Sequence, residues 1–302
     1  MKMNSISVII LTFNEEKHIE RCIKSLLPIS TDIYIIDSFS TDTTVEIAKA
    51  LGAKIYTNKW INYAKQFQWA LDNCPISTTW VMRMDSDEYI LPELALELNN
   101  KVDNIGQNIS GLYIKRRMYF KGQWIKYGSK YPEWLLRVWR YEDGYIEEKW
   151  MDEHVVLKKG ETIKLKYDLV DDNLNGITWW TKKHNNYATR EAIDILNINY
   201  NFTNKENEIN PKLFGNQVER KKYLKNVYAS LPLFTRPFIY FFWRYILRFG
   251  FLDKTQGLIW HFLQAFWYRF LVDVKIYEIK KESKRQNISI TDFIKKEYGM
   301  II

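Results

Sequence analysis

The sequence predicts an α/β fold in which a mostly parallel central sheet is flanked by helices. Over residues 1–90, short apolar runs typical of strands alternate with segments whose apolar residues recur at helical spacing. Alternation of this kind favours a parallel sheet that is covered on both faces. Between residues 231 and 277 the sequence is instead dense in aromatic residues, which predicts a helical appendage after the α/β part.

The first predicted strand is a β-branched run at residues 6–11, and the segment after it can start a helix. Asn14 is a good helix N-cap, and Glu15 and Glu16 suit the positive end of a helix dipole. The predicted helix carries its apolar residues on one face: Ile19, Cys22, Ile23, Leu26 and Leu27.

A second strand at residues 33–36 ends at Asp37, the first residue of the acidic cluster DSFSTD. Ser40 or Thr41 can cap the next helix, and Gly52 is placed to end it. This strand and helix repeat the order of the first pair.

The same pattern continues with a strand at residues 53–56, a helix at 62–71 and a strand at 80–84. The last strand is followed by a second acidic cluster, DSDE at residues 85–88. Because a parallel α/β sheet binds its ligand outside the carboxyl ends of its strands, the two acidic clusters should converge on one crevice. Acidic side chains where phosphates would bind suggest that a metal ion bridges the carboxylates and the phosphates.

These motifs resemble glycosyltransferase family 2, whose members have the GT-A fold, a Rossmann-like arrangement. The resemblance rests on the runs SVIILTFNEE at residues 7–16, DSFSTD at 37–42 and DSDE at 85–88. More narrowly, the chain resembles bacterial glycosyltransferases of lipopolysaccharide-core and capsule assembly. That similarity continues through residues 150–154, 179–188 and 250–253, so it covers nearly the whole chain.

The predicted division is a GT-A catalytic domain at residues 1–225 and a carboxyl-terminal helical region at 226–302. No uncharged apolar stretch reaches 18 residues and no signal-peptide pattern follows Lys2, so we expect a cytoplasmic protein. Cys22 and Cys74 predict two free thiols, because so sparse a pair rarely forms a disulfide framework.

The balance of 44 basic and 36 acidic residues gives a net charge of +8, which suits nucleic acid, an anionic membrane or simple solubility. No nucleic-acid-binding motif is present, and this argues against the first. On an aromatic helix at residues 238–249, Arg244 and Arg248 lie on one side, so the helix can lie in a membrane interface. This predicts a peripheral protein on the inner face of the cytoplasmic membrane. The alternative is an internal hydrophobic hairpin.

Transfer from a nucleotide sugar requires a diphosphate to leave, and a divalent ion can neutralise the charge that develops. Hard oxygen ligands suit Mn²⁺ or Mg²⁺. The resemblance implies that Asp87 ligates this ion, while Asp85 contacts the ribose, the ion or both. Two residues apart on a strand end, they point to the same side. Alone, the pair would favour exposed loop acids that start a turn before Pro92, but together with Asp37 and the amino-terminal motif it favours the metal site.

The nucleotide is expected across the first two strand ends. The resemblance implies that Thr12, Asn14 and Glu15 line the uridine or ribose, that Asp37 accepts a hydrogen bond from it, and that Lys65 and Gln66 lie beneath the base. For Ser38, turn formation is an equal alternative, and for Lys65 and Gln66 a solvated helix face. The predicted nucleotide-sugar residues are Thr12, Asn14, Glu15, Asp37, Ser38, Lys65, Gln66, Arg83, Asp85 and Ser86.

An inverting transfer needs a carboxylate behind the sugar to deprotonate the acceptor hydroxyl. By resemblance Glu153 is the base, with Asp152 in reserve. Here His154 follows the acid, whereas the commoner family pattern places a histidine before it. His154 could contact a phosphate or the metal, or act as a structural partner.

Acceptor recognition is expected to involve Trp179, Lys183 and His184, because aromatic faces stack on sugars and cations bind phosphate. Arg137 could also meet an acceptor phosphate, and the tryptophans could instead be core residues. The predicted function is an inverting, metal-dependent transferase that moves a sugar from a nucleotide-sugar donor, UDP-hexose, to a glycolipid or oligosaccharide acceptor in the biosynthesis of cell-surface polysaccharide or lipopolysaccharide. The alternative is a non-catalytic, nucleotide-sugar-binding scaffold of the same fold.

Overall fold

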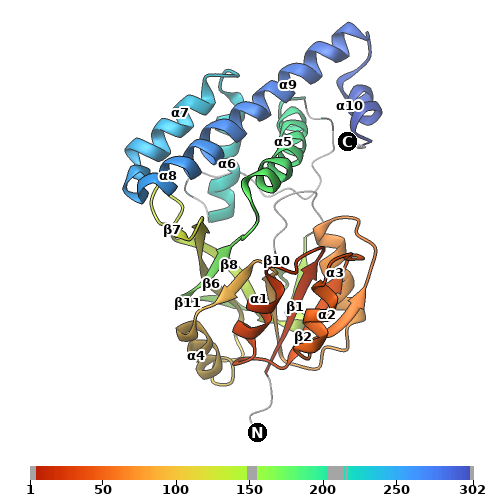
Figure 1. Ribbon diagram of the computed structural model, residues 1–302, viewed down its shortest axis with the longest axis vertical. Helices are drawn as coiled ribbons and strands as arrows, with labels where there is room; N and C mark the ends of the chain where they lie inside the picture. Colours follow the sequence, from red (N-terminus) through yellow and green to blue (C-terminus); the bar gives the residue numbers. More distant parts are fainter. Residues whose placement is uncertain (1–4, 148–154, 201, 203–213, 215–216, 300–302) are drawn as a thin grey trace. The chain divides into compact units, whose positions relative to one another are not determined.

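The computed structural model describes residues 5–147, 155–200, 202, 214 and 217–299 (Figure 1). The chain forms two compact units, Met1–Asn175 and Gly176–Ile302. The sequence-based boundary between residues 225 and 226 falls inside helix α6 (Gln217–Ser230), whereas the structural division comes before helix α5 (Ile177–Tyr200).

In the described part of unit 1 the main sheet has nine strands in the order β3-β2-β1-β4-β8-β6-β11-β5, with β7 paired to β6. They are β1 (Ile6–Thr12), β2 (Asp32–Asp37), β3 (Lys54–Thr57), β4 (Trp80–Asp85), β5 (Glu88–Ile90), β6 (Ile109–Phe120), β7 (Gln123–Ile125), β8 (Glu133–Arg140) and β11 (Glu161–Asp172). A separate hairpin pairs β9 (Gly144–Ile146) with β10 (Val155–Leu157).

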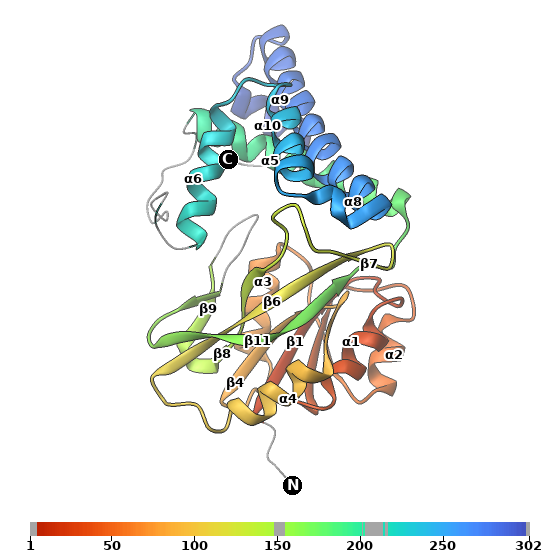
Figure 2. The ribbon, with the colours of Figure 1, turned by 90° about the vertical axis from the view of Figure 1, so that its left-hand side faces the viewer.

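The first four strands are parallel, as predicted, and their carboxyl ends share one edge. The second half is mixed, because β8 runs antiparallel to both β4 and β6. Strand β6 therefore points in the same direction as β4, and its carboxyl end lies at that same edge. Figure 2 shows β6 and β11 side by side as the two long strands of this half.

Helices cover both faces of the sheet. One core joins α1 (Ile19–Leu26), α2 (Thr44–Ala50) and α4 (Pro92–Lys101) to strand residues such as Val8 and Ile10. The other joins α3 (Tyr63–Asn73) to Ile9 and Tyr34. Side chains alternate along a strand, so neighbouring residues of β1 serve opposite cores. This confirms the predicted fold class. Cys22 and Cys74 are buried and free.

Unit 2 is helical, with π-helical and 3-10 turns at 243–247, 250–253 and 262–267. Its remaining helices are α7 (Arg236–Phe242), α8 (Lys254–His261), α9 (Tyr268–Arg285) and α10 (Ile290–Tyr298). Helix α5 packs along α9 through Ala192, Leu196 and Ile276. A buried ion pair between Arg236 and Asp273, 2.8 Å from Nε to Oδ1, ties α7 to α9. Among the described residues, no helix has both the length and the apolarity needed to cross a bilayer.

Candidate active site

The loops that follow β1 and β2 are tied together by hydrogen bonds. The Asp37 carboxylate accepts hydrogen bonds from Thr12 Oγ1 at 2.9 Å and from the Ser40 backbone nitrogen at 2.8 Å. Asn14, in the left-handed region at φ 57°, donates its backbone N–H to Ser40 Oγ and accepts from the Thr41 backbone. The two loops thus form one continuous rim, with Asp37 buried beneath it.

Glu15 extends this rim toward the end of β11. Its carboxylate accepts a 2.7 Å hydrogen bond from His18 Nδ1, and His18 Nε2 accepts one from the Leu174 backbone N–H at 2.9 Å. A backbone N–H can only donate, so His18 carries its proton on Nδ1. The Glu15 side chain is therefore held by a histidine rather than left pointing into solvent.

Helix α3 contributes Gln66 to the same edge. Gln66 Nε2 donates to Ser38 Oγ at 3.0 Å, and its amide oxygen accepts from Asn58 at 2.9 Å. Lys65, in the first turn of α3, has an exposed side chain, while Ser86 is buried after β4. The structure thus brings Gln66 and Ser38 together and leaves Lys65 exposed on α3.

Asp85, at the end of β4, is held by three neighbours. Tyr63 donates its hydroxyl to Oδ1 at 2.8 Å, and Arg137 Nη2 lies 3.1 Å from Oδ2. Arg83 lies over the Tyr63 ring, with its Nε 3.8 Å from Oδ1. Burial raises the pKa of Asp85, but Arg137 and Arg83 outweigh it and hold the pKa well below its usual range. Asp85 is therefore a carboxylate at any physiological pH.

Asp87 is less constrained than Asp85. Within the described part of the chain its carboxylate accepts one hydrogen bond, from Asn173 Nδ2 to Oδ2 at 2.9 Å. Its backbone oxygen accepts the Asp172 N–H, which fixes the turn after β4 to the end of β11. Asp87 thus keeps lone pairs for a ligand. Sequence reasoning placed Asp85 and Asp87 at this edge, and the structure places them there.

Two further acids lie beside them: Glu88, which belongs to the predicted acidic cluster, and Asp171, which the sequence analysis did not single out. Glu88 is buried, with Oε1 2.5 Å from Arg137 Nη2, and burial raises its pKa to about 8 against the effect of Arg137. Asp171 lies 3.1 Å from Arg116, and burial, opposed by Arg116, raises its pKa to about 6. Arg137, which the sequence suggested for an acceptor phosphate, instead joins Asp85 and Glu88. Adjacent acids at 171–172, closing a strand-like run, were the available sequence indication.

The predicted base, Glu153, and its reserve, Asp152, lie outside the described residues, as does His154. Strand β9 ends at Ile146, which pairs with Val155 at the start of β10. The Ile146 backbone N–H donates to Gln68 on α3 at 3.3 Å. Among described residues, no group of three histidine, cysteine or acidic side chains is arranged to hold a metal ion.

The predicted acceptor residues all lie on α5 in unit 2. His184 donates from Nδ1 to the Trp180 carbonyl oxygen, accepts at Nε2 from Gln264, and stacks on the Trp180 ring. Burial lowers the pKa of His184 to about 4. Trp179 is about one-third exposed, with Lys183 Nζ 4.6 Å from its ring centre. His184 is thus engaged in internal packing, while Trp179 remains at the surface.

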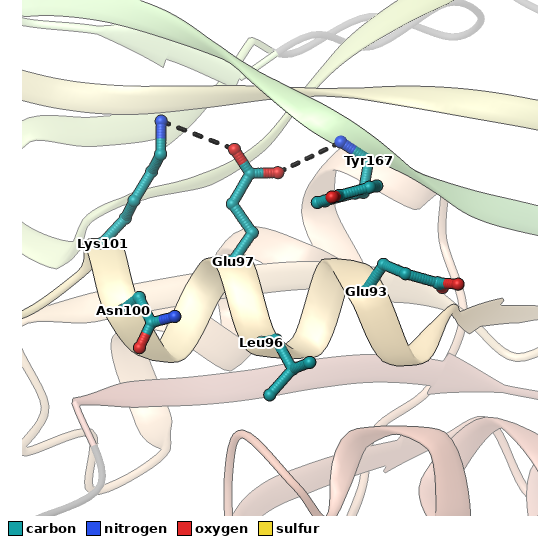
Figure 3. Close-up of a pocket in the computed structure, with 6 residues that line it drawn as sticks. All are labelled: Glu93, Leu96, Glu97, Asn100, Lys101 and Tyr167. Atoms are coloured by element: carbon teal, nitrogen blue, oxygen red, sulfur yellow. Dashed lines mark hydrogen bonds and ion pairs between the residues drawn. The ribbon is translucent and has the colours of Figure 1, made fainter.

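A surface hollow lies away from all of these residues. It is formed by α4 and one residue of β11 (Figure 3): Glu93, Leu96, Glu97, Asn100, Lys101 and Tyr167. The Glu97 carboxylate in it accepts the backbone N–H groups of Lys166 and Tyr167 and pairs with Lys101. With its acid already bound, the hollow offers no reactive group, and we do not assign it to the chemistry.

Comparison with known proteins decides the family of the amino-terminal part of this chain. The family model for glycosyl transferase family 2 matches residues 7–154. Residues 7–154 form a glycosyl transferase family 2 domain. The matched segment begins in β1 and contains Asp37, Asp85 and Asp87, so the family assignment rests on the same loops that form the rim and the acidic cluster.

Among relatives of this family 2 protein, an uncharacterized glycosyltransferase of Rickettsia typhi is 40% identical over 103 residues. The match covers 34% of this chain and 33% of that protein, so the chain spans about a third of its length. The lipopolysaccharide core biosynthesis glycosyltransferase LpsC of Rhizobium meliloti is 27% identical over 301 residues, 94% of this chain and 96% of LpsC.

Among solved structures, one similar protein is glucosyl-3-phosphoglycerate synthase from Mycobacterium tuberculosis in complex with Mn²⁺, UDP and glucosyl-3-phosphoglycerate. The TM-score is 0.32 at 25% identity, covering 38% of this chain and 44% of that chain.

Proposed function

We propose that this family 2 protein is an inverting, metal-dependent glycosyltransferase. Its donor is a nucleotide sugar, UDP-hexose, and its acceptor is a glycolipid or oligosaccharide of lipopolysaccharide or related cell-surface polysaccharide. One observation carries the proposal: strands β1, β2 and β4 end at one edge of the sheet. Asp37 and Asp85 are the last residues of β2 and β4, and Asp87 lies in the turn after β4. The likeness to LpsC along nearly the whole chain supports a role in lipopolysaccharide core synthesis.

The nucleotide is assigned to the rim made by the loops after β1 and β2. Thr12 and Ser40 hold Asp37, and Gln66 holds Ser38, so the rim is pre-organised before a ligand arrives. Because the rim is already ordered, nucleotide binding loses less conformational entropy. Lys65 and Arg83 flank this edge as cations for the diphosphate.

The donor set beside the rim fits Mn²⁺ or Mg²⁺. These ions take hard oxygen ligands and commonly use one or two carboxylates, with phosphates and water completing the shell. Asp87 has lone pairs to offer, and Asp85 is kept as a carboxylate by Arg137 and Arg83. When bound, such an ion neutralises charge on the leaving diphosphate. Asp87 is therefore the first ligand, and Asp85 is the second ligand or the ribose contact.

Glu153 is proposed as the base that accepts the proton of the acceptor hydroxyl, with Asp152 in reserve. The segment that carries both residues joins β9 to β10, and α3 anchors β9 through Gln68. Helix α3 also supplies Tyr63 to Asp85, so one helix supports both the donor side and the start of the segment that carries the base.

Unit 2 is proposed to hold the protein at the inner face of the cytoplasmic membrane. Large apolar side chains, each at least 41% exposed, gather along residues 238–262: Phe238, Ile239, Phe242, Ile246, Leu247, Phe249, Phe251, Leu252, Leu258, Ile259 and Phe262. So large an apolar surface is rare on a monomer that faces only water. We name residues 246–259 the apolar tip.

The charges around the apolar tip suit an anionic lipid surface. Arg248 and Lys254 are exposed, while Asp253, the one acid between residues 237 and 272, is buried. Arg244, which the sequence paired with Arg248 as a headgroup contact, is 7% exposed and lies 4.8 Å from the Trp260 ring centre. Its role is internal packing, because the π-helical turn at residues 243–247 contacts α8. The headgroup contacts are therefore assigned to Arg248 and Lys254.

Release of UDP from a panel of UDP-sugars, with and without Mn²⁺, tests the catalytic proposal against the scaffold alternative. The enzyme should release UDP from at least one UDP-sugar only when Mn²⁺ is present, and it should transfer the sugar of that donor to a lipopolysaccharide-core acceptor. A protein that binds UDP-sugars but never releases UDP, with acceptor supplied, would be the scaffold.

A further inference from the structure

Cations and tryptophan rings cover one face of the sheet beside the acidic cluster. We name this surface the basic platform, and it consists of Lys115, Arg117, Trp124, Lys126, Trp134 and Lys164. All six belong to unit 1, on or directly after strands β6, β7, β8 and β11. None of them enters the contacts described for the rim.

The platform is built from two tryptophans, each flanked by two cations. The Arg117 guanidinium carbon lies 4.6 Å from the centre of the Trp124 ring, and Lys126 Nζ lies 5.4 Å from it. Lys115 and Lys164 place their Nζ atoms 5.6 Å and 5.0 Å from the centre of the Trp134 ring. The rings hold the cations in place and remain partly open to solvent.

Strand register explains why these residues share a face. Lys115 on β6 lies directly opposite Trp134 on β8, and Lys164 on β11 lies opposite Tyr113, two residues before Lys115. Residues that are paired across strands, or two apart along one strand, point to the same side. Arg116, between Lys115 and Arg117, points to the other side and binds Asp171 and Glu133.

The carboxylate that binds the platform's cations is itself buried. Asp168 is 3% exposed and accepts from Arg117 Nε at 2.6 Å, with Lys115 Nζ 3.2 Å away. One shared carboxylate cannot neutralise both cations, and the exposed Lys164 adds a third positive charge on the same face. An incoming anion therefore meets a positive surface with aromatic walls.

Strand β8 separates β4, which ends at Asp85, from β6, which carries the platform residues Lys115 and Arg117. Arg116, which lies between the platform residues Lys115 and Arg117 in β6, faces the opposite side of the sheet, where its Nη1 lies 3.1 Å from Asp171 and 4.0 Å from Glu88. Strands β4 and β6 run in the same direction, so Asp85 and Arg117 both lie toward the carboxyl edge. The rim lies over β1 and β2, on the other side of β4 from β6.

We propose that the basic platform binds a negatively charged sugar of the acceptor, one that carries a phosphate or a carboxylate group. Tryptophan faces stack on the apolar face of a pyranose ring, and the cations form charge-assisted hydrogen bonds to its anionic group. The inference rests on the proposed function, in which the nucleotide sugar binds at the rim over β1 and β2. The acceptor then approaches from the β6 side of β4, where the platform lies.

The test compares a platform variant with a charge-matched control. Lys126→Glu with Lys164→Glu reverses two exposed platform charges, and Lys49→Glu with Lys295→Glu makes the same charge change on α2 and α10. With UDP and Mn²⁺ at saturation, calorimetry measures binding of mannose 6-phosphate, of trigalacturonic acid, of neutral maltotriose and of sodium phosphate. UDP affinity is measured separately for every protein.

The wild-type protein and the control should bind mannose 6-phosphate or trigalacturonic acid more tightly than maltotriose. The platform variant should lose about tenfold or more of that affinity, since two charge-assisted contacts are removed, with UDP affinity unchanged. The comparison of mannose 6-phosphate with trigalacturonic acid identifies whether a phosphate or a carboxylate group is preferred. Equal affinity in platform variant and control, no binding of either anionic sugar, or equally tight binding of sodium phosphate would overturn the inference. Failure of wild-type UDP binding would instead count against the proposed function.

Discussion

The Tyr63 hydroxyl donates a 2.8 Å hydrogen bond to Oδ1 of Asp85, which links helix α3 to the end of β4. The Tyr63 ring stacks on Phe67 and lies under the Arg83 guanidinium group. Tyr63 thus sets the orientation of Asp85 without being acidic itself. Burial raises the pKa of the Tyr63 hydroxyl well above its usual value, so it stays a donor.

Tyr63→Phe should weaken Mn²⁺-dependent UDP binding about three- to tenfold, the equivalent of one lost hydrogen bond. The ring packing on Phe67 is retained, so the melting temperature should change little. Tyr141→Phe is the matched control, because it removes a hydroxyl that donates to the Leu71 carbonyl oxygen at 2.7 Å. Equal UDP affinity in Tyr63→Phe and Tyr141→Phe would show that the Asp85 contact does not matter for the nucleotide.

Glu153→Gln should keep UDP-sugar affinity and lose on the order of 10² to 10⁴ in transfer rate, because the amide cannot accept the proton. Asp152→Asn should cost less. Single-turnover transfer to a core oligosaccharide, alongside calorimetric donor binding, separates the two roles. A larger loss in Asp152→Asn would move the base to Asp152, and near-normal rates in both variants would remove this segment from the chemistry.

Lowering the pH should destabilise unit 2 through His184. Its folded pKa is about 4, whereas an unperturbed histidine has a pKa of about 6.5. Between these values the unfolded chain binds more protons than the folded chain, so the free energy of unfolding falls as the pH drops through this window. His184→Gln should flatten the decline in melting temperature between about pH 6.5 and pH 4. Identical slopes in wild type and variant would contradict the assignment.

Reversing the charges of the apolar tip should release the protein from anionic liposomes. Each cation near such a surface contributes roughly 1 kcal/mol, so Arg248→Glu with Lys254→Glu removes two attractive contacts and adds two repulsive ones. Lys281→Glu with Lys284→Glu, on exposed positions of α9, is the control and should still float with the liposomes. Hydrolysis of a soluble donor should persist in both variants.

Two outcomes of the flotation experiment separate the membrane assignment from an internal hairpin. If wild type floats with neither anionic nor neutral liposomes, the membrane assignment is wrong. If the variant with Arg248→Glu and Lys254→Glu floats as well as the α9 control, Arg248 and Lys254 do not make the membrane contact.

The parts of the fold that follow from local pattern were predictable. Runs such as residues 33–36 end at an acid, and strand-helix alternation places those ends together, so Asp37, Asp85 and Asp87 could be assigned to one edge. Arg137 and Asp171 could not, because their partners depend on the register of β8 and β11, strands that enter the sheet far along the chain.

The aromatic region shows the same limit. Helical spacing places Arg244 and Arg248 on one side, but it does not say which side is covered. A π-helical turn at residues 243–247 and close packing of Gly250 against the Arg244 carbonyl and His261 bury Arg244 and leave Arg248 exposed. Burial of this kind depends on tertiary packing, which local spacing does not encode.

Calorimetric titration of UDP into wild type and Asp87→Ala, with and without Mn²⁺, tests the central assignment most directly. Wild type should bind UDP much more tightly with Mn²⁺ than without it, and Asp87→Ala should lose on the order of 100-fold in the Mn²⁺-dependent part. The variant should stay folded, since the Asp87 side chain is partly exposed and accepts one hydrogen bond among the described residues. An unchanged Mn²⁺ dependence in a folded Asp87→Ala would contradict the account.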